Sequence, residues 1–480
     1  MKNGKDLADY AIEIGSKKGV KYIEARFLQS ITEGYTTRNG GLVSGGTNKN
    51  VGIGIRVLAD GGLGFFSTAN LNKSNIESAV KKAIKMAKTC DRKTPINFSE
   101  EPIVTAKWKT NVKEPFEDIS DEEKIELITD IDKQLQAQDY AENLVVRTLM
   151  LNLIRNKKYI VTSEGSQVES DKSLITFYTY NTAKGPKGTE QRFYGDAASK
   201  GWEWFDENNV IEGIINDNAA LVKATIQAED MTLGKIDVIV SGEVSGIIAH
   251  ENTGHPSEGD RILGREGAQA GESFYIDLLE EGELGEIKLG TEAVNLIDDP
   301  TLPDSPGYYE YDDECVKAKP RYLIKEGRMN ELLLNREFAA RFNTHSTAAA
   351  RAISFNREPI IRMANTYFAP GDYEIEELIE DVKKGIYMKS FTEWNIDDRR
   401  FQSKYVGLEV YLIENGELTD KMIRRPVLEL TTFGIFGCVD AVAKDFEATY
   451  GTCGKGDPMQ GVPVWMGGAH VRMRDIRLGG

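Results

Sequence analysis

The chain has 480 residues, of which 40% are hydrophobic and 28% charged, and its formal net charge is -17 at pH 7. A chain of this length is too long for a single hydrophobic core, so we expect two or three domains. The acidic balance argues against a general nucleic-acid-binding surface and against docking on anionic membranes.

Cysteine content and the distribution of apolar residues indicate the compartment. The four cysteines are widely spaced and do not resemble a disulfide framework, so they fit a reducing environment. Residues 1–19 lack the apolar region of a signal peptide, and no stretch approaches the ~20 apolar residues of a membrane span. We therefore expect a cytoplasmic protein with neither membrane nor nucleic-acid partners.

Helical and strand patterns alternate through the first part of the chain. Helices are predicted near residues 7–14 and 76–87, after the capping box Ser120-x-x-Glu123, and at about 210–224. Strands are predicted for three β-rich runs, 144–146, 159–161 and 174–180. We expect residues 1–230 to form a mixed α/β region with antiparallel strands, which allows two subdomains, 1–110 and 111–230.

Strand patterns dominate after a seam near residues 229–234. Hairpins are predicted at 322–334, turning at Glu326-Gly327, and from 405–413 onward, turning at Asn415-Gly416. A helix is predicted around 375–382, ending at Gly385. We expect residues 231–480 to form a β-rich domain with a barrel-like antiparallel sheet, and the fold class to be α+β.

Two of the four histidines lie in one six-residue window, His250-Glu251-Asn252-Thr253-Gly254-His255. Neutral imidazoles are zinc ligands, and an adjacent glutamate can deprotonate a zinc-bound water. The window therefore indicates metal-assisted hydrolysis. The alternative is a surface helix end with two solvated histidines.

The spacing of the two histidines leaves two geometries open. Residues five apart on an ideal α-helix differ by about 140° in direction, so one metal ion requires either a π-bulge or a helix that ends between them. Gly254 and Pro256 favour the helix end, because glycine often follows a helix and a residue before proline avoids helical angles. We expect His250 and Glu251 on the last helical turn and His255 just beyond it.

The residues before this window predict a strand and a helix that hold it in place. Residues 235–240 (KIDVIV) read as a strand, and Ser241 can cap the helix that follows. Val244, Ile247 and Ile248 give that helix a core-facing stripe. Glu251 falls beside this stripe, and an apolar boundary predicts a raised pKa, which suits a general base.

A catalytic zinc site usually needs a third protein ligand and one open position. The residue types leave many candidates: His345, His470, the four cysteines and numerous carboxylates. Cys453 is notable because it lies in a glycine-dense segment, 451–456, where we expect a loop. Lys455 beside it would lower the thiol pKa, although a free cysteine in a turn explains the same residues.

Other candidate sites have weaker support from their residues. The glycines at 40–41 and 45–46 lack the Gly-Lys-Ser/Thr ending of a phosphate loop, so a turn is the simpler interpretation. His345 has no accompanying nucleophile motif. Arg357, Arg362 and Asn365 are candidates for holding a substrate carboxylate or peptide backbone, although exposed strand arginines are an equal alternative.

Several segments resemble the signatures of the TldD/PmbA family of metalloproteases. They are residues 250–260 (HENTGHPSEGD), 357–366 (REPIIRMANT) and 451–470 (GTCGKGDPMQGVPVWMGGAH), and residues 51–69 are similar to the family's first domain. The resemblance covers nearly the whole chain and departs at 456–460, where the family has a shorter stretch. It implies His250, His255 and Cys453 as ligands of one zinc ion per chain and Glu251 as the base. Because the metal set is retained, the chain resembles the TldD-type active subunit.

The resemblance implies a zinc-dependent peptidase that acts on unfolded or short peptides bound as an extended strand. It also implies a homodimer, or a heterodimer with a related subunit, that encloses the site. One alternative is a non-catalytic peptide-binding or partner subunit of such a complex, for which a fourth metal ligand would be diagnostic. Another is a metal hydrolase acting on non-peptide amides.

Overall fold

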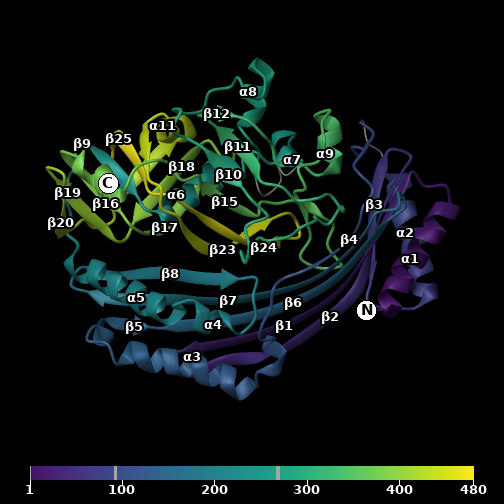
Figure 1. The fold of residues 1–480 in the computed structure, drawn as a ribbon, viewed down its shortest axis with the longest axis horizontal. Coiled ribbons are helices and arrows are strands. Elements are labelled where there is room, and N and C mark those ends of the chain that lie inside the picture. The colour runs from purple at the N-terminus through teal and green to yellow at the C-terminus, as the bar shows by residue number, and fades with distance from the viewer. Residues whose placement is uncertain (1, 91–93, 266–270, 480) are drawn as a thin grey trace.

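A long, curved sheet of eight strands forms the N-terminal half of the protein (Figure 1). The computed structural model describes residues 2–90, 94–265 and 271–479. β1 pairs antiparallel with both β2 and β6 over nearly its whole length, so one sheet joins residues 1–110 to residues 111–230. Its strands are β1 (Tyr22–Arg38), β2 (Gly41–Ala59), β3 (Gly62–Thr68), β4 (Thr105–Lys109), β5 (Leu144–Val146), β6 (Thr148–Thr162), β7 (Gln167–Gly185) and β8 (Gly188–Ala198).

Helices cover the two ends of this sheet, and they confirm the predicted helices. α1 (Lys2–Lys17) and α2 (Lys73–Thr89) pack around one apolar cluster at one end. α3 (Asp121–Gln136), α4 (Trp204–Glu207) and α5 (Val210–Gln227) lie at the other end around a second cluster. The capping box of α3 is present, since Ser120 and Glu123 bond each other's backbone N–H groups. Two 3-10 turns, Phe116–Asp118 and Ala141–Asn143, flank α3.

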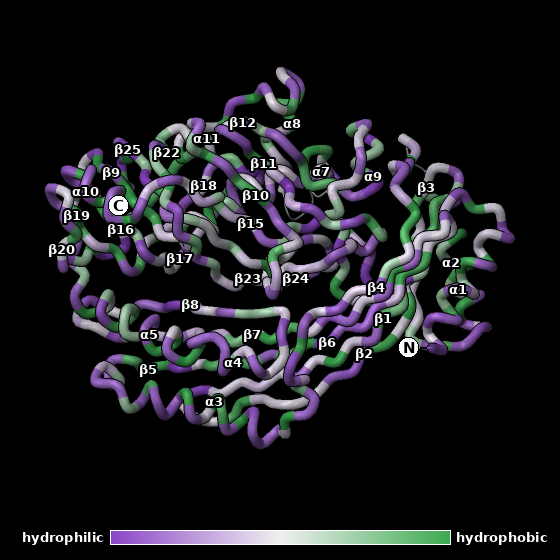
Figure 2. Tube along the Cα trace, viewed as in Figure 1, coloured by the Kyte–Doolittle hydropathy of each residue, from purple (hydrophilic) through white to green (hydrophobic). Residues whose placement is uncertain are grey.

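The predicted strands of this half are present, but two of them are much longer than their apolar runs. Residues 144–146 coincide with β5, whereas 159–161 and 174–180 are only parts of β6 and β7. Figure 2 shows hydrophobic and hydrophilic residues interspersed along these long strands. The length of these strands does not follow from a simple alternation of apolar and polar residues, because different elements cover different parts of them: α1 and α3 contact β6, and α5 contacts β7.

The C-terminal half contains two six-stranded sheets and two smaller ones. In spatial order the first consists of β12 (Arg328–Met329), β11 (Arg321–Lys325), β10 (Leu296–Asp298), β15 (Asn365–Phe368), β24 (Gln460–Gly468) and β23 (Glu447–Lys455). The second consists of β20 (Glu417–Met422), β19 (Val410–Glu414), β16 (Lys384–Met388), β9 (Lys235–Val240), β25 (Val471–Arg477) and β22 (Val439–Val442). The smaller sheets are β17 (Phe391–Ile396), β18 (Gln402–Gly407) and β21 (Val427–Thr431), and the pair β13 (Ala350–Arg351) and β14 (Ile360–Ile361).

The predicted barrel-like antiparallel sheet in residues 231–480 is therefore wrong in detail, although the half is β-rich and the α+β class holds. Each six-stranded sheet contains one parallel pair, β15 with β24 and β9 with β16. Hairpin signals report only antiparallel neighbours along the chain, and these parallel pairs join strands that are distant in sequence.

Some of the turns and helix ends predicted for this half are present, and others are not. β11 and β12 form the predicted hairpin, and β19 and β20 turn at Asn415-Gly416, which both adopt positive φ. The run 405–413, however, divides between β18 and β19, which belong to different sheets. The helix predicted around 375–382 is present, but in the structure it ends at Glu380. Gly385 lies inside β16, where a Cβ would be 2.5 Å from the Asp237 carbonyl oxygen. Gly385 thus permits close strand pairing and does not end the helix.

Short helices complete the C-terminal half and enclose its core. They are α6 (Gly242–Ala249), α7 (Gly259–Ile262), α8 (Tyr275–Glu281), α9 (Arg336–Arg341), α10 (Ile375–Glu380) and α11 (Thr432–Phe436). The largest apolar cluster of the molecule lies here, around α6 and the two six-stranded sheets. Among the described helices, none has the length and apolar character needed to cross a membrane.

Candidate metal centre

The helix that leads into the histidine motif begins where its sequence predicts. β9 leads directly into α6, and the Ser241 hydroxyl caps the helix by accepting a hydrogen bond from the Val244 N–H at 3.3 Å. Val244, Ile247 and Ile248 are all buried in the C-terminal core. Contacts with β15, β23 and β24 fix α6 in place, so the residues that follow it are held rigidly.

The backbone continues from α6 into a π-helical turn, His250–Gly254. The His255 N–H donates to the His250 carbonyl oxygen at 3.1 Å, and His255 itself has helical angles, φ −64° and ψ −43°. The prediction that the helix ends between the histidines is therefore wrong, and the π-bulge alternative is correct. A Cβ on Gly254 would lie 1.9 Å from the Met363 sulfur, so this glycine permits close packing within the turn.

The wider turn brings the two histidines together with Cys453. The ligand atoms of His250, His255 and Cys453 all lie within 4.8 Å of one another, and each residue is buried. The Cys453 sulfur is 3.6 Å from Nε2 of His255. Nδ1 of His250 is buried without a hydrogen-bond partner in the described structure, which is costly for a polar atom unless a ligand occupies the space.

Cys453 lies on a strand and not in the predicted loop. It belongs to β23 and pairs with Val462 of β24, so the hairpin holds its thiol at a fixed position. The longer stretch 456–460 forms the turn of this hairpin and the start of β24. The sheet therefore fixes the thiol more firmly than a free loop would.

The environment of Cys453 favours its thiolate. Burial raises the pKa of the thiol, but the opposing charges of His255 and Arg362 lower it overall to about 7. Lys455, which was expected to have this effect, instead pairs with Asp260 at 2.7 Å and Glu258 at 3.3 Å. The cause of the shift was therefore predicted wrongly, although its direction was right.

Glu258 contacts one of the candidate ligands, and the sequence interpretation missed it. Its side chain is fully buried, and Oε2 lies 3.0 Å from Nδ1 of His255, which leaves Nε2 of that ring facing Cys453. Burial raises the pKa of Glu258, but Lys455 and Arg261 together hold it well below the usual range. A carboxylate that orients a ligand histidine is a common outer partner in metal sites, so its position three residues after His255 was the available signal.

Glu251 lies beside these ligand atoms at the wall of a cleft. The Trp394 indole N–H donates to its Oε1 at 3.1 Å, and the Arg400 guanidinium is 3.8 Å from Oε2. Burial raises the pKa of Glu251, but the charges of His255, His250 and Arg400 lower it overall. The predicted raised pKa is therefore wrong, because the carboxylate faces cations and an N–H donor and does not face apolar side chains alone.

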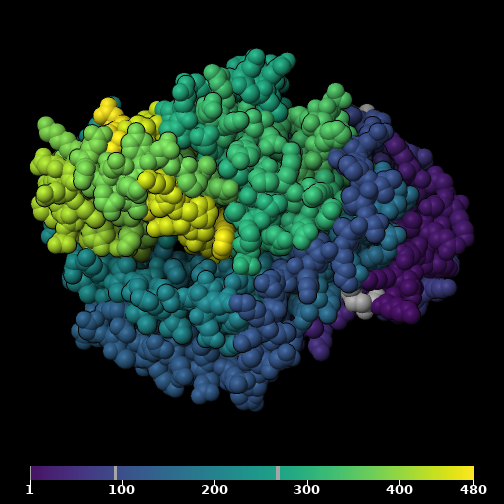
Figure 3. Space-filling model, viewed as in Figure 1, coloured from purple at the N-terminus to yellow at the C-terminus, as the bar shows by residue number. Residues whose placement is uncertain are grey.

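The cleft has a volume of about 500 Å³ and separates the curved sheet from the C-terminal half. Figure 3 shows this hollow below the yellow strands β23 and β24 and above the teal part of the sheet. His250, Glu251, His255 and Cys453 line it together with residues 449–454 of β23. The wall of the cleft is rich in aromatic side chains: Tyr178, Phe193, Phe391, Trp394 and Tyr450.

The other predicted site residues lie elsewhere or have structural contacts. Arg362 is fully buried and donates to the carbonyl oxygens of Gln460 and Cys453. Asn365 is also fully buried, and its side chain donates to the Asp299 carbonyl oxygen and accepts from the Trp465 N–H of β24. Both were predicted to hold substrate, and in this structure their side chains bond backbone atoms of the C-terminal half. Arg357 is half-buried and does not line the cleft. His345 is largely exposed, and both ring nitrogens of His470 are bonded, to Asp445 and Tyr387.

We predict that iodoacetamide alkylates Cys453 in metal-free protein with a pH profile centred near 7. The thiolate is the reactive form, so the rate rises as pH passes through the thiol pKa of about 7. Cys438 is an internal comparison, because burial raises the pKa of that thiol. Mass spectrometry of the modified peptides gives both profiles. A Cys453 profile at or above that of Cys438 contradicts the prediction, and added zinc should suppress only the Cys453 reaction.

Comparisons with known proteins agree along the whole chain. Models of three PmbA/TldA metallopeptidase domains match it: domain 1 at residues 23–87, the central domain at 114–225 and the C-terminal domain at 233–480. A metalloprotease of Methanocaldococcus jannaschii is 32% identical, covering 97% of this chain and 96% of the relative. A zinc metalloprotease TldD homolog of Saccharolobus solfataricus is also 32% identical, over 52% of each chain.

A solved structure shares the fold. TldE from Thermococcus kodakarensis superposes with a TM-score of 0.75 at 19% identity, covering 99% of this chain and 100% of that one. At this level of identity the likeness concerns architecture, including the curved sheet and the C-terminal half.

Proposed function

The chain belongs to the PmbA/TldD metallopeptidase family, and we propose that it is a zinc-dependent peptidase that hydrolyses short or unfolded peptides. Its relatives are named metalloproteases, which supports a protease. The observation that carries the proposal is the convergence of His250, His255 and Cys453 beside Glu251 at the wall of one cleft.

The donor set suits one zinc ion per chain. Two imidazoles and a thiolate favour zinc over harder divalent ions, and three protein ligands leave one position open for chemistry. The unpartnered Nδ1 of His250 and the lowered pKa of Cys453 both support a cation in this space. Glu258 would orient the His255 ring for binding.

Glu251 is proposed as the general base and acid. A zinc ion at this site would supply a Lewis acid that polarises the scissile carbonyl and lowers the pKa of a water beside it. The lowered pKa of Glu251 keeps its carboxylate unprotonated near neutral pH, so it can accept the proton of the attacking water. The same carboxyl group then returns the proton to the leaving amine. Trp394 and Arg400 hold the carboxylate in position.

The shape of the cleft suits an extended peptide. β23 is the edge strand of its sheet, and its residues 449–454 line the cleft beside the candidate ligands. Backbone hydrogen bonds to an edge strand bind peptides with little regard to sequence, and the aromatic wall would contact apolar side chains. We therefore expect loose selectivity with a preference for apolar residues near the cleaved bond.

A non-catalytic subunit with a structural metal is less well supported. Structural zinc sites are closed by four protein ligands. Within the described residues, the group of ligand atoms that contains His250, His255 and Cys453 has only these three members. Peptide cleavage by purified, zinc-loaded protein, abolished when the zinc is removed, tests the proposed function.

We also propose that the protein works as a dimer, either of two identical chains or with a related subunit. The cleft lies at the surface between two halves of one chain, and a second subunit over it would exclude water and folded proteins. Light scattering should give the mass of two chains, either for the purified chain alone or once the related subunit is added. A monomer that cleaves peptides at full rate would contradict this arrangement.

A further inference from the structure

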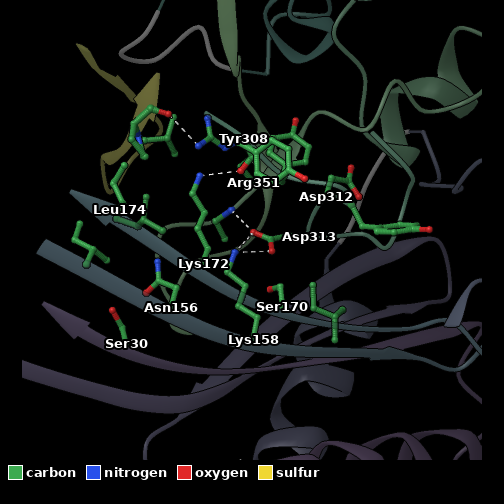
Figure 4. Close-up of a pocket in the computed structure, with 18 of the residues that line it drawn as sticks. Ser30, Asn156, Lys158, Ser170, Lys172, Leu174, Tyr308, Asp312, Asp313 and Arg351 are labelled. Atoms are coloured by element: carbon green, nitrogen blue, oxygen red, sulfur yellow. Dashed lines mark hydrogen bonds and ion pairs between the residues drawn. The ribbon is translucent and has the colours of Figure 1, made fainter. Parts of the chain in front are cut away.

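A second cavity, of about 210 Å³, lies next to the cleft and has no role in the proposed mechanism. β6 and β7 of the curved sheet form its floor (Figure 4). Residues 308–309, 311–313, 350–353 and 461–463 of the C-terminal half form its other walls. The cavity has room for a few water-sized groups, so its ligand is a small chemical group or the end of a chain.

Three cationic side chains meet in this cavity: Lys158, Lys172 and Arg351. Lys158 is paired with Asp313 at 2.7 Å. Within the described chain, the hydrogen bonds of Lys172 go to the carbonyl oxygens of Pro306 and Tyr308, at 2.6 and 2.8 Å. Arg351 likewise donates to backbone carbonyls, those of Met363 and Pro463, at 2.6 and 3.0 Å. Among the described residues, no carboxylate forms an ion pair with Lys172 or Arg351.

Partly buried cations that face one another without a counter-ion are unfavourable. Burial lowers the pKa of Lys172 well below its usual range, with further lowering by Arg351 and Lys158, and burial also lowers the pKa of Arg351 to about 10. An anion between them would relieve this repulsion. The carboxylate of Asp312, also at the wall, cannot serve, because its oxygens accept N–H bonds from Glu314, Val316 and Ala350.

Two residues of the same wall also have polar atoms that are not hydrogen-bonded to the described residues. Nε1 of Trp108 and Oδ1 of Asn156 are buried without a hydrogen-bond partner in the part of the chain that the structure describes. Buried polar groups are nearly always bonded to protein, water or ligand. Their presence beside the unpaired cations indicates a cavity that is completed by a polar ligand.

The cavity is connected to the candidate metal centre through β24 and Arg351. Gly461, Val462 and Pro463 line the cavity, whereas Val464 and Met466 of the same strand line the cleft. Pro463, to which Arg351 is bonded, pairs with Thr452, the residue before Cys453. A peptide that follows this hairpin through the cleft would therefore have its end near the three cations.

We propose that this cavity binds a carboxylate of the peptide substrate, normally its free C-terminal carboxylate, through Lys172 and Arg351. The inference rests on the proposed function, because it places the end of a peptide whose middle lies in the cleft. It makes the protein selective for short peptides with a free C-terminus, since an internal segment of a long chain offers no such group at this position.

The test compares three N-terminally dansylated pentapeptides with zinc-loaded Glu251→Gln protein, which binds without cleaving. They are Ala-Ala-Leu-Ala-Ala with a free carboxylate, the same peptide with a C-terminal carboxamide, and a carboxamide peptide that ends in glutamate. Fluorescence anisotropy should give a Kd for the free acid at least about tenfold below that of the alanine amide. If the glutamate amide binds as tightly as the free acid, the cavity accepts any carboxylate. If it binds as weakly as the alanine amide, the cavity accepts only the C-terminal carboxylate.

Variants locate the effect in the cavity. Lys172→Met should raise the Kd of the free acid to that of the amide, and Lys172→Arg should retain the difference. Lys184→Met is a matched control, because Lys184 is an exposed residue of the same strand, β7, that does not line the cavity. The comparison of acid with amide needs no variant of Lys172, so misfolding of Lys172→Met leaves the test intact.

The outcomes separate this inference from the proposed function. Equal Kd values for acid and amide, together with cleavage of both peptides by the wild type, overturn the carboxylate site and leave the peptidase standing. If neither peptide binds or is cleaved, both the inference and the proposed function are wrong.

Discussion

Glu251→Gln should lower peptide cleavage by about 10²- to 10⁴-fold, the range that a general acid–base group contributes, and should leave the zinc content unchanged. Glutamine has nearly the same shape and keeps an oxygen that can accept the Trp394 N–H bond at Oε1. It cannot accept a proton from the attacking water. The measurement is kcat on a quenched fluorescent peptide, together with zinc per chain by elemental mass spectrometry.

A matched control removes the same charge elsewhere. Glu280 is exposed on α8, so Glu280→Gln should cleave at the wild-type rate. Wild-type turnover by Glu251→Gln would reject Glu251 as the base. Loss of zinc from Glu251→Gln would instead show that the carboxylate supports the metal, and the role proposed for it would again be wrong.

Cys453→Ser should weaken zinc retention by more than about a hundredfold, since loss of an outer partner alone commonly costs 10- to 100-fold. A hydroxyl in place of the thiol does not ionise near neutral pH, whereas the pKa of the Cys453 thiol is about 7. Competition with a fluorescent zinc chelator gives the affinities of both proteins. Peptide cleavage should decline in parallel unless excess zinc is supplied.

Cys438→Ser is the control for this substitution. Cys438 is half-buried near β22 and does not line the cleft, so its replacement should leave zinc affinity unchanged. Equal zinc affinities of Cys453→Ser and the wild type would exclude Cys453 as a ligand and would direct attention to another donor near His250 and His255.

Local signals in the sequence predicted the local structure well. The Ser120 capping box, the Ser241 cap and the apolar stripe of α6 all occur as expected, because each depends on residues within one helical turn. The pairing of β15 with β24 could not be predicted, because no nearby residues specify a parallel partner distant in sequence. The length of β6 and β7 could not be predicted either, because different elements cover different parts of them.

The candidate site was only partly accessible from the sequence. The histidine window indicated a metal, but the choice of Cys453 depended on family resemblance, since a free cysteine in a turn explains its glycine-dense segment equally well. The preference for a helix end over a π-bulge failed because Gly254 is needed for packing against Met363, a contact between distant segments. Arg362 and Asn365 were chosen as substrate-binding candidates for their hydrogen-bonding groups. In the structure the same groups donate to backbone carbonyl oxygens. Trp394 and Arg400 come from a segment far from Glu251 in sequence and carry no motif.

The most direct test of a zinc peptidase centred on His250, His255, Cys453 and Glu251 is a zinc titration of the metal-free protein with cleavage followed at each step. The predicted result is no cleavage without zinc, a linear rise in rate, and a plateau at one zinc per chain. Cleavage that is already maximal without zinc, or a protein that binds one zinc per chain and still cleaves no peptide, would contradict the account.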